Sequence, residues 1–167
     1  INRLQIIDST TVPLFSHMLF KCVGRHPKTG KKKGGLKVHT NIHANEGVPS
    51  DVKFTSAATN DSFMLKPTNY IEGDIVALDR AYIDYGKFEE LTSRGVIYVT
   101  KMKKNLVCQI DEDTAYMTPE GLMEYRVKHV TFTKNVAEGS DIVHKARIVA
   151  YVDIKKNKQA KLISLLT

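Results

Sequence analysis

The chain has 167 residues, of which 42% are hydrophobic and 26% are charged. This composition is typical of a globular protein long enough to bury a core, and it excludes a wholly disordered or collagen-like chain. Lysine and arginine number 25 against 18 aspartates and glutamates, a formal net charge of +7 at pH 7, which favours a polyanionic partner such as nucleic acid.

The N-terminal part of the chain predicts a strand and then a basic loop. Residues 4–8 form an apolar run, which predicts a buried strand that ends in the carboxylate of Asp8. Residues 10–20 have weak helical periodicity and predict an irregular helix. Residues 22–35 are rich in glycine and in lysine, which predicts a flexible basic loop.

Residues 36–44 alternate between apolar and polar side chains, which predicts a strand with one packed side and one side facing solvent. The expected packed side carries Leu36, Val38, Thr40 and Ile42, and the expected exposed side carries Lys37, His39, Asn41 and His43. His39 and His43 would lie about 13 Å apart on such a strand, too far to share one metal ion. Residues 45–47 predict a hairpin turn into another strand over 48–56.

The middle of the chain predicts parallel strands. Residues 75–78 form an apolar strand that ends in Asp79. Asp84 is expected to cap a helix that ends at Gly95, and residues 96–100 form the next strand. A strand, a helix and a strand of these lengths imply parallel pairing, so we expect a mixed α/β sheet.

From residue 106 onward the chain consists of strand-like runs joined by polar links. These runs cover residues 106–110, 125–132, 145–154 and 161–166, and a lysine-rich turn at 155–158 joins the last two. We therefore expect two parts, a mixed α/β part over residues 1–105 and a mostly β part over residues 106–167.

Cysteine usage and hydropathy argue against a secreted or membrane-bound protein. Cys22 and Cys108 lie far apart and in no metal-binding spacing, so neither a disulfide framework nor a zinc finger is predicted. No apolar run reaches the roughly 20 residues needed to cross a bilayer, and residues 1–5 do not resemble a signal peptide. We expect a cytoplasmic protein without a membrane partner. Because the chain has no initiating methionine, we also expect it to be an internal part of a longer protein.

Asp8 and Asp79 are the most informative pair of residues. Each follows an apolar strand, and carboxylates at the ends of neighbouring strands repel one another unless a divalent cation neutralises them. Magnesium suits such a pair, because it prefers oxygen ligands and leaves positions open for phosphate oxygens. The competing interpretation is that one or both aspartates only cap a turn or a helix.

Two groups of basic residues could follow a nucleic-acid backbone. The first group is the predicted loop and the residue that follows it, namely Arg25, Lys31, Lys32, Lys33 and Lys37. The second group follows the strand at 96–100 and comprises Lys101, Lys103 and Lys104. A solvated run of lysines explains either group equally well.

Five strings of residues carry a resemblance to a known family. They are 6–11 (Ile-Ile-Asp-Ser-Thr-Thr), 24–25 with 30–40 (Gly-Arg and Gly-Lys-Lys-Lys-Gly-Gly-Leu-Lys-Val-His-Thr), 54–58 (Phe-Thr-Ser-Ala-Ala), 60–62 (Asn-Asp-Ser) and 77–82 (Ala-Leu-Asp-Arg-Ala-Tyr). Their order resembles that of DDE-class transposases of bacterial insertion sequences, in particular the group called family four. The strings are spread over residues 6–82, and the resemblance thus spans most of the first 105 residues.

The resemblance implies a ribonuclease-H-like fold followed by a β-rich insertion, which here would be residues 106–167. It implies that Asp8 and Asp79 are two catalytic acids and ligate two Mg²⁺ or Mn²⁺ ions, about 3.5 to 4 Å apart. Arg80 and Tyr82 are expected to position DNA, and packing around the strand end is the alternative. The third acid of the family is a glutamate in a Tyr-Arg-Glu-Lys signature on a later helix, and this sequence does not contain that signature.

We therefore expect the catalytic core of a transposase that cuts element ends and joins them to target DNA, as a homodimer in the bacterial cytoplasm. Without the third acid, the 167-residue chain by itself is expected to be inactive. Two other interpretations stay open, a DNA-binding module with an incomplete set of acids and a related nuclease that hydrolyses DNA without strand transfer. A missing final helix also predicts an exposed apolar patch on the sheet.

Overall fold

The computed structural model describes residues 3–13, 23–25, 32–103, 105–121, 123–135, 141–154 and 160–167. The strands in these ranges are β1 (Leu4–Pro13), β2 (Val23–Arg25), β3 (Lys32–His43), β4 (Val48–Ser56), β5 (Ile75–Leu78), β6 (Ile97–Lys101), β7 (Gln109–Met117), β8 (Glu124–Lys134), β9 (Ile142–Ile154) and β10 (Ala160–Leu166). The α-helix is α1 (Tyr85–Ser93), and the 3-10 helices are η1 (Asp61–Met64), η2 (Pro67–Asn69) and η3 (Arg80–Tyr82). Within the described part of the chain, no helix is long and apolar enough to cross a membrane.

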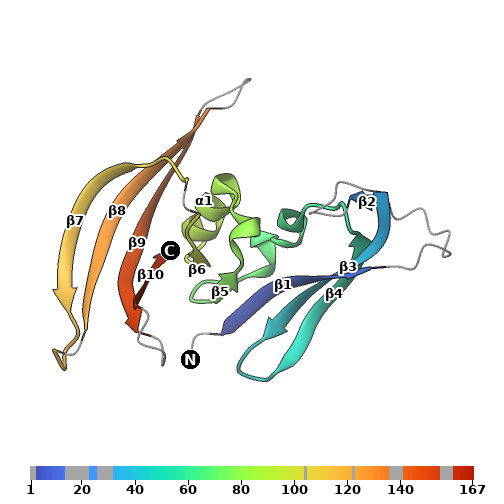
Figure 1. Ribbon diagram of the computed structural model, residues 1–167, viewed down its shortest axis with the longest axis horizontal. Helices are drawn as coiled ribbons and strands as arrows, with labels where there is room; N and C mark the ends of the chain where they lie inside the picture. The colour runs from blue at the N-terminus through green and yellow to red at the C-terminus, as the bar shows by residue number, and fades with distance from the viewer. Residues whose placement is uncertain are drawn as a thin grey trace.

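A single mixed sheet contains all of these strands. Its order is β2-β3-β1-β5-β6-β10-β9-β8-β7, and β4 pairs with β3. Strands β1, β5 and β6 are parallel, and the other pairs are antiparallel. Figure 1 shows two arms of the sheet, β1–β4 and β7–β10, with α1 and the 3-10 helices between them. The mixed sheet and the parallel strand-helix-strand unit are therefore confirmed.

Helix α1 begins and ends where the sequence predicts. The Asp84 carboxylate accepts hydrogen bonds from two backbone N–H groups of the first turn, and Gly95 beyond the last turn has a φ of +70°, which favours glycine. Phe88 and Leu91 are fully buried. The Phe88 ring stacks on that of Tyr98 in β6, with 4.1 Å between the ring centroids. The helix thus packs against β6.

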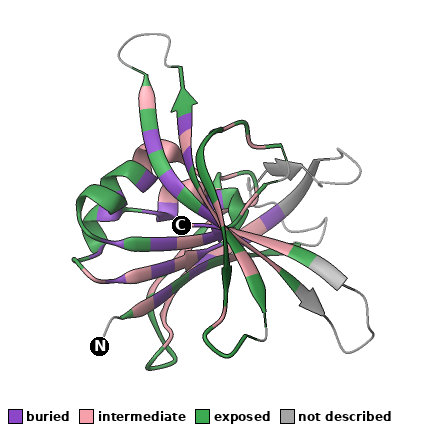
Figure 2. Ribbon diagram, turned by 90° about the vertical axis from the view of Figure 1, so that its left-hand side faces the viewer, coloured by how far each residue is buried: buried purple, intermediate pink, exposed green. Residues whose placement is uncertain are grey.

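The hydrophobic core lies where the helical segments meet the sheet. Its fully buried members come from both arms and from the centre, and include Ile7, Val76, Phe132 and Leu166. Figure 2 shows buried and exposed residues alternating along the strands, as expected for a sheet with one packed face. The edge strand β7 lacks this alternation, because it borders only β8 and most of its residues are exposed on both sides. Without alternation, no pattern in the sequence marks β7. The strand predicted at 106–110 is therefore wrong in position, since β7 covers Gln109–Met117.

His144 of β9 joins the C-terminal arm to the centre of the molecule. Its imidazole is fully buried, with Nδ1 2.7 Å from Glu89 Oε2 of α1 and Nε2 2.6 Å from Tyr98 Oη of β6. With a proton on Nδ1, the ring donates to the carboxylate and accepts from the hydroxyl. Strand β9 is therefore joined through one buried imidazole to α1 and β6, which lie about fifty residues earlier in the chain.

Two local predictions near the N-terminus are wrong. Residues 10–13 belong to β1 and not to a helix, because β1 continues beside β3 as far as the pair Pro13 and Gly35. Part of the predicted basic loop is also a strand ladder, in which Val23–Arg25 pairs with residues 32–34. The other residues of that helix and loop, 14–22 and 26–31, lie outside the described residues, as does the turn predicted at 155–158.

The two sides of β3 are buried in the opposite way to the prediction. His39 is fully buried and Lys37 and Asn41 are nearly so, whereas the apolar side chains of the other side are only half-buried. The cause is η1, since its Phe63 packs edge-on against His39 with 4.8 Å between the ring centroids. On the opposite face of this arm, the predicted apolar patch is present and includes Ile6, Val12, Val52 and Phe54.

Asp74 holds the start of β5 to the start of β1. Its two carboxylate oxygens accept hydrogen bonds from Arg3 Nε at 2.9 Å and Arg3 Nη2 at 2.8 Å, and one of them also accepts from the Ile71 backbone N–H at 3.1 Å. Burial alone would raise the pKa of Asp74, but the hydrogen bonds from Arg3 and Ile71 lower this pKa below its ordinary value of 3.8.

We expect Asp74→Ala to lower the free energy of unfolding at pH 7 by about 1 to 3 kcal/mol, because the Ile71 N–H loses its acceptor. A carboxyl whose pKa is lowered by folding contributes stability that is complete above about pH 4 and is lost as the pH falls further. Urea unfolding of both proteins at pH 7 and at about pH 3 measures the difference. An equal difference at the two pH values would contradict this assignment.

Candidate functional site

Asp8 and Asp79 lie side by side where the parallel pairing of β1 with β5 ends. Ile7 of β1 and Leu78 of β5 are partners in the parallel ladder, and each aspartate is the next residue along its strand. Adjacent strands are about 4.8 Å apart, so the ladder brings the Asp8 carboxylate, in the middle of β1, beside that of Asp79, which follows the last residue of β5. Both side chains are exposed. The juxtaposition predicted from the two apolar runs is therefore present.

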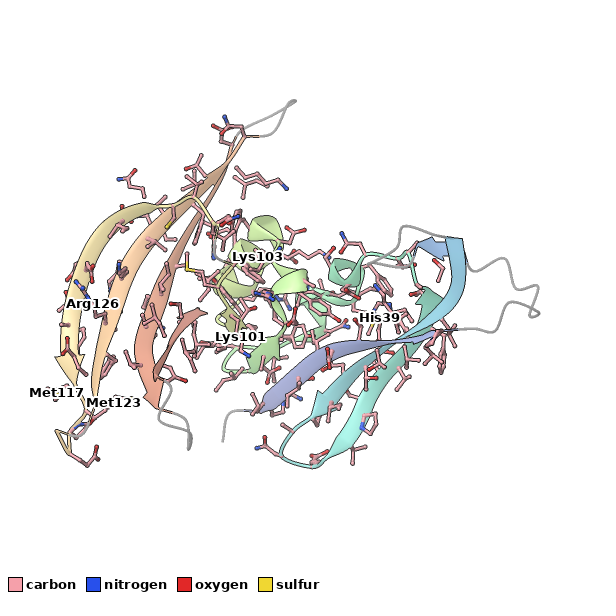
Figure 3. The ribbon with its side chains drawn as sticks, in the orientation of Figure 1. His39, Lys101, Lys103, Met117, Met123 and Arg126 are labelled. Carbon is pink, nitrogen blue, oxygen red and sulfur yellow. The ribbon has the colours of Figure 1, made fainter. Side chains whose placement is uncertain are left out.

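The two aspartates line a shared open cavity of about 310 Å³. Its other lining residues are Ile6, Ile7, Ala77, Leu78 and Lys101. Lys101 is the last residue of β6, which neighbours β5, and its exposed ammonium group has no hydrogen bond or ion pair with any residue that the structure describes. Figure 3 places Lys101 near the centre of the molecule, between the two arms of the sheet. The cavity thus combines two carboxylates with one unpaired cation.

Each carboxylate is oriented by a backbone N–H group and keeps one oxygen available. Ser9 N donates to Asp8 Oδ1 at 2.8 Å, and Ala81 N donates to Asp79 Oδ1 at 2.9 Å. Asp79 is therefore the N-cap of η3, as the competing interpretation expected. Capping uses only Oδ1, and no described residue hydrogen-bonds to Oδ2 of either aspartate. Capping and ligand binding are compatible here.

A buried polar cluster supports the strand on which Asp8 lies. Asp61 Oδ1 of η1 accepts a hydrogen bond from Ser9 Oγ at 2.8 Å and lies 3.2 Å from Lys37 Nζ and 3.5 Å from His39 Nδ1. His39 Nε2 lies 2.8 Å from Thr55 Oγ1. Burial lowers the pKa of His39, and the nearby Asp61 opposes this effect. The one signal that the sequence offered for Asp61 was its position in the Asn-Asp-Ser string at 60–62.

The residues predicted to contact DNA have different environments. Arg80 is exposed and directly follows Asp79. Lys37 is 9% exposed and donates to the Thr59 carbonyl at 2.8 Å. Tyr82 is fully buried, and burial raises its pKa to about 12. Both of these polar groups point away from solvent, which favours the packing alternative for Tyr82. Arg25, Lys32 and Lys33 belong to the β2–β3 ladder, of whose side chains the structure gives no description, and Lys31 lies outside the described residues.

The cavity supplies part of the ligand set that a divalent cation needs. Asp8 and Asp79 offer free carboxylate oxygens, the donor type that Mg²⁺ and Mn²⁺ prefer. In the part of the chain that the structure describes, no third histidine, cysteine, aspartate or glutamate joins them in a group that could hold a metal ion. The two aspartates therefore provide two of the ligands of such a site, and its other ligands are not among the described residues.

Comparison with known families accounts for nearly the whole chain. Residues 2–162 match a family model described as "Transposase DDE domain". No curated protein matches the chain. The match spans both Asp8 and Asp79 and continues through β7, β8 and β9 into β10.

Proposed function

The chain belongs to the transposase DDE domain family, and we propose that it contributes Asp8 and Asp79 as catalytic acids for cutting and joining DNA. Membership implies metal-dependent DNA cleavage in transposition in general. The observation that carries the proposal for this chain is the shared cavity, in which the parallel ladder of β1 and β5 brings both carboxylates together.

Asp8 and Asp79 would hold the divalent cations through their free Oδ2 atoms. When bound, such ions lower the pKa of an attacking water or 3′ hydroxyl and stabilise the leaving oxygen. The backbone N–H groups of Ser9 and Ala81 hold the carboxylates in place, and the Ser9 to Asp61 hydrogen bond anchors the strand from the other face of the sheet. Lys101 offsets part of the negative charge and is placed to contact a phosphate oxygen of the strand to be cut.

The resemblance adds finer detail to this proposal. We place the chain in the family-four group, with a ribonuclease-H-like part over residues 1–105 and a β-rich insertion over residues 106–167. The third acid would be the glutamate of the Tyr-Arg-Glu-Lys signature, two Mg²⁺ or Mn²⁺ ions would bind, and a homodimer would act on DNA in the bacterial cytoplasm. The residues proposed to contact DNA are Arg25, Lys31, Lys32, Lys33, Lys37, Arg80 and Tyr82. The burial of Lys37 and Tyr82 makes these two the weakest members of that set.

A strand-joining assay tests this function. A form of the protein that also contains the proposed third catalytic glutamate is used. It is mixed with labelled duplexes that carry 3′ hydroxyl ends and with supercoiled plasmid, in Mg²⁺ or Mn²⁺ buffer. We expect nicked plasmid and labelled duplex joined to plasmid, and neither product in EDTA. Nicking without joined product would replace the proposal by a metal-dependent nuclease. DNA binding with neither product would replace it by a DNA-binding module.

A further inference from the structure

A second cavity is lined in part by residues that follow Asp79 in the chain, beginning with Ala81 of η3. Its volume is about 360 Å³, and it is lined by Asn60, Ser62, Ala81, Ile83, Asp84, Tyr85, Lys103, Leu106 and Lys134. Lys103 follows β6, whereas Lys134 is the last residue of β8 in the C-terminal arm. The sequence separates these two lysines by about thirty residues, and only the fold brings them to one cavity. Figure 3 places Lys103 close to α1, between the arms.

The charges around this cavity are mostly positive. Lys103 and Lys134 are exposed, and neither forms an ion pair or a side-chain hydrogen bond with the residues for which the structure gives positions. Lys87 of α1 donates to the Ser62 carbonyl and brings a third ammonium group close to the cavity. Asp84 is the acidic lining residue, and its Oδ1 already accepts from the backbone N–H groups of Gly86 and Lys87. A cavity with this balance attracts an anion.

The position of the cavity indicates which anion it takes. Asp79 lines the cavity that it shares with Asp8, and Ala81, two residues later, lines the second cavity. Lys101 and Lys103 show the same relation, and two residues of extended chain span at most about 7 Å. One strand of a duplex advances about 3.4 Å along the helix axis per phosphate. A strand whose phosphate lies at Asp8 and Asp79 would therefore bring another phosphate, one or two nucleotides away, to the second cavity.

We propose that Lys103 and Lys134 form a second phosphate subsite, which binds the DNA backbone beside the cleaved position. The subsite rests on the proposed function for its ligand, because the anion is a phosphate of the same strand. It gives the C-terminal arm a direct part in holding DNA. Neutral groups on its walls, such as Asn60, Ser62 and Ile83, suit the sugar-phosphate backbone and provide no set of donors that would read a base.

Salt-dependent DNA binding tests the subsite without any cleavage. Binding of a labelled duplex of unrelated sequence is followed by fluorescence anisotropy in EDTA, over a range of salt concentrations. Each lysine-phosphate contact contributes about 0.9 to the slope of log K against log salt, and hence about eight-fold in affinity at 0.1 M salt. For Lys103→Gln with Lys134→Gln we expect the slope to fall by about 1.8 and the affinity by roughly 60-fold. Lys103→Arg with Lys134→Arg should retain both values.

The matched control is Lys66→Gln with Lys145→Gln, which removes the same charge from two exposed lysines outside the cavity. The subsite is supported if the Lys103 and Lys134 pair loses at least one unit of slope more than this control, with an unchanged thermal unfolding temperature. Equal losses in the two pairs, or no loss, would overturn it. If cleavage depends on Asp8 but the lysine variants bind DNA normally, the subsite is contradicted and the proposed function is not. If DNA binding depends on Lys103 and Lys134 but no metal-dependent cleavage is found, the proposed function is contradicted and the subsite is not.

Discussion

Asp8→Asn and Asp79→Asn are each expected to reduce metal-dependent DNA nicking by at least about a thousand-fold. Each change removes one anionic ligand and leaves a side chain of nearly the same shape. Metal ions supply several kcal/mol of stabilisation to the charge that develops in phosphoryl transfer, and about 4 kcal/mol corresponds to a thousand-fold in rate. Asparagine is also a good N-cap, so Asp79→Asn should keep η3 and leave the fold intact.

The measurement is nicking of supercoiled plasmid in Mn²⁺ by a form of the protein that includes the proposed third acid, with calorimetric titration of Mn²⁺ into the 167-residue chain. Glu90→Gln is a suitable control, because Glu90 is exposed on α1 and lines neither of the cavities at η3. The control should cleave like the unaltered protein. Undiminished nicking by either aspartate variant would show that these carboxylates are structural. Loss of nicking together with a lowered unfolding temperature would point to a folding defect.

His144→Ala is expected to destabilise the protein by about 3 to 5 kcal/mol. The substitution leaves a cavity among the rings of Tyr85, Phe88 and Tyr98, whose centroids lie 5.7 to 6.4 Å from that of His144. Loss of a large buried ring costs about this amount in other proteins. It also leaves the hydroxyl of Tyr98, a residue that is 2% exposed, without its partner, and an unpaired buried hydroxyl is costly.

Urea unfolding and amide hydrogen exchange measure this effect. Exchange should accelerate most in β6, β9 and α1, because His144 joins these elements across the core. Tyr98→Phe is the intermediate case, since it keeps the ring packing and removes one hydrogen bond, at a cost of about 1 to 3 kcal/mol. Glu89→Gln should cost less than 1 kcal/mol, because this carboxylate is half exposed. A His144→Ala protein as stable as Glu89→Gln would contradict the role given to the buried imidazole.

Much of the fold follows from local patterns in the sequence. The apolar runs that end in Asp8 and Asp79 predicted two carboxylates on neighbouring strands, and the ladder pair of Ile7 and Leu78 confirms this. The predicted end of the first strand at Asp8 is wrong, because β1 continues beside β3 to Pro13. Asp84 and Gly95 marked the ends of α1 because capping and positive φ depend on residues close in sequence. Three of the four strands expected after residue 106 also correspond to strands of the structure, namely β8, β9 and β10.

The sequence failed where burial depends on distant residues. Alternation along β3 identified its two sides, but the apolar one was taken as the packed side. The polar side is buried instead, because Phe63 covers His39 and because Asp61 and Thr59 satisfy the Lys37 ammonium group. A buried polar group is tolerated when its hydrogen bonds are made, and those partners lie about twenty residues further along the chain.

The sequence by itself therefore predicted the mixed α/β class, the parallel pairing of β5 with β6 and the two neighbouring aspartates, because periodicity and capping are local properties. Only the tertiary structure decided which face of the N-terminal arm is packed, that His144 meets Glu89 and Tyr98, and that Lys134 lies across a cavity from Lys103. Each of these depends on how the C-terminal arm or η1 folds back on the sheet. Such contacts join residues about twenty to fifty-five positions apart, and no short-range pattern in the chain records them.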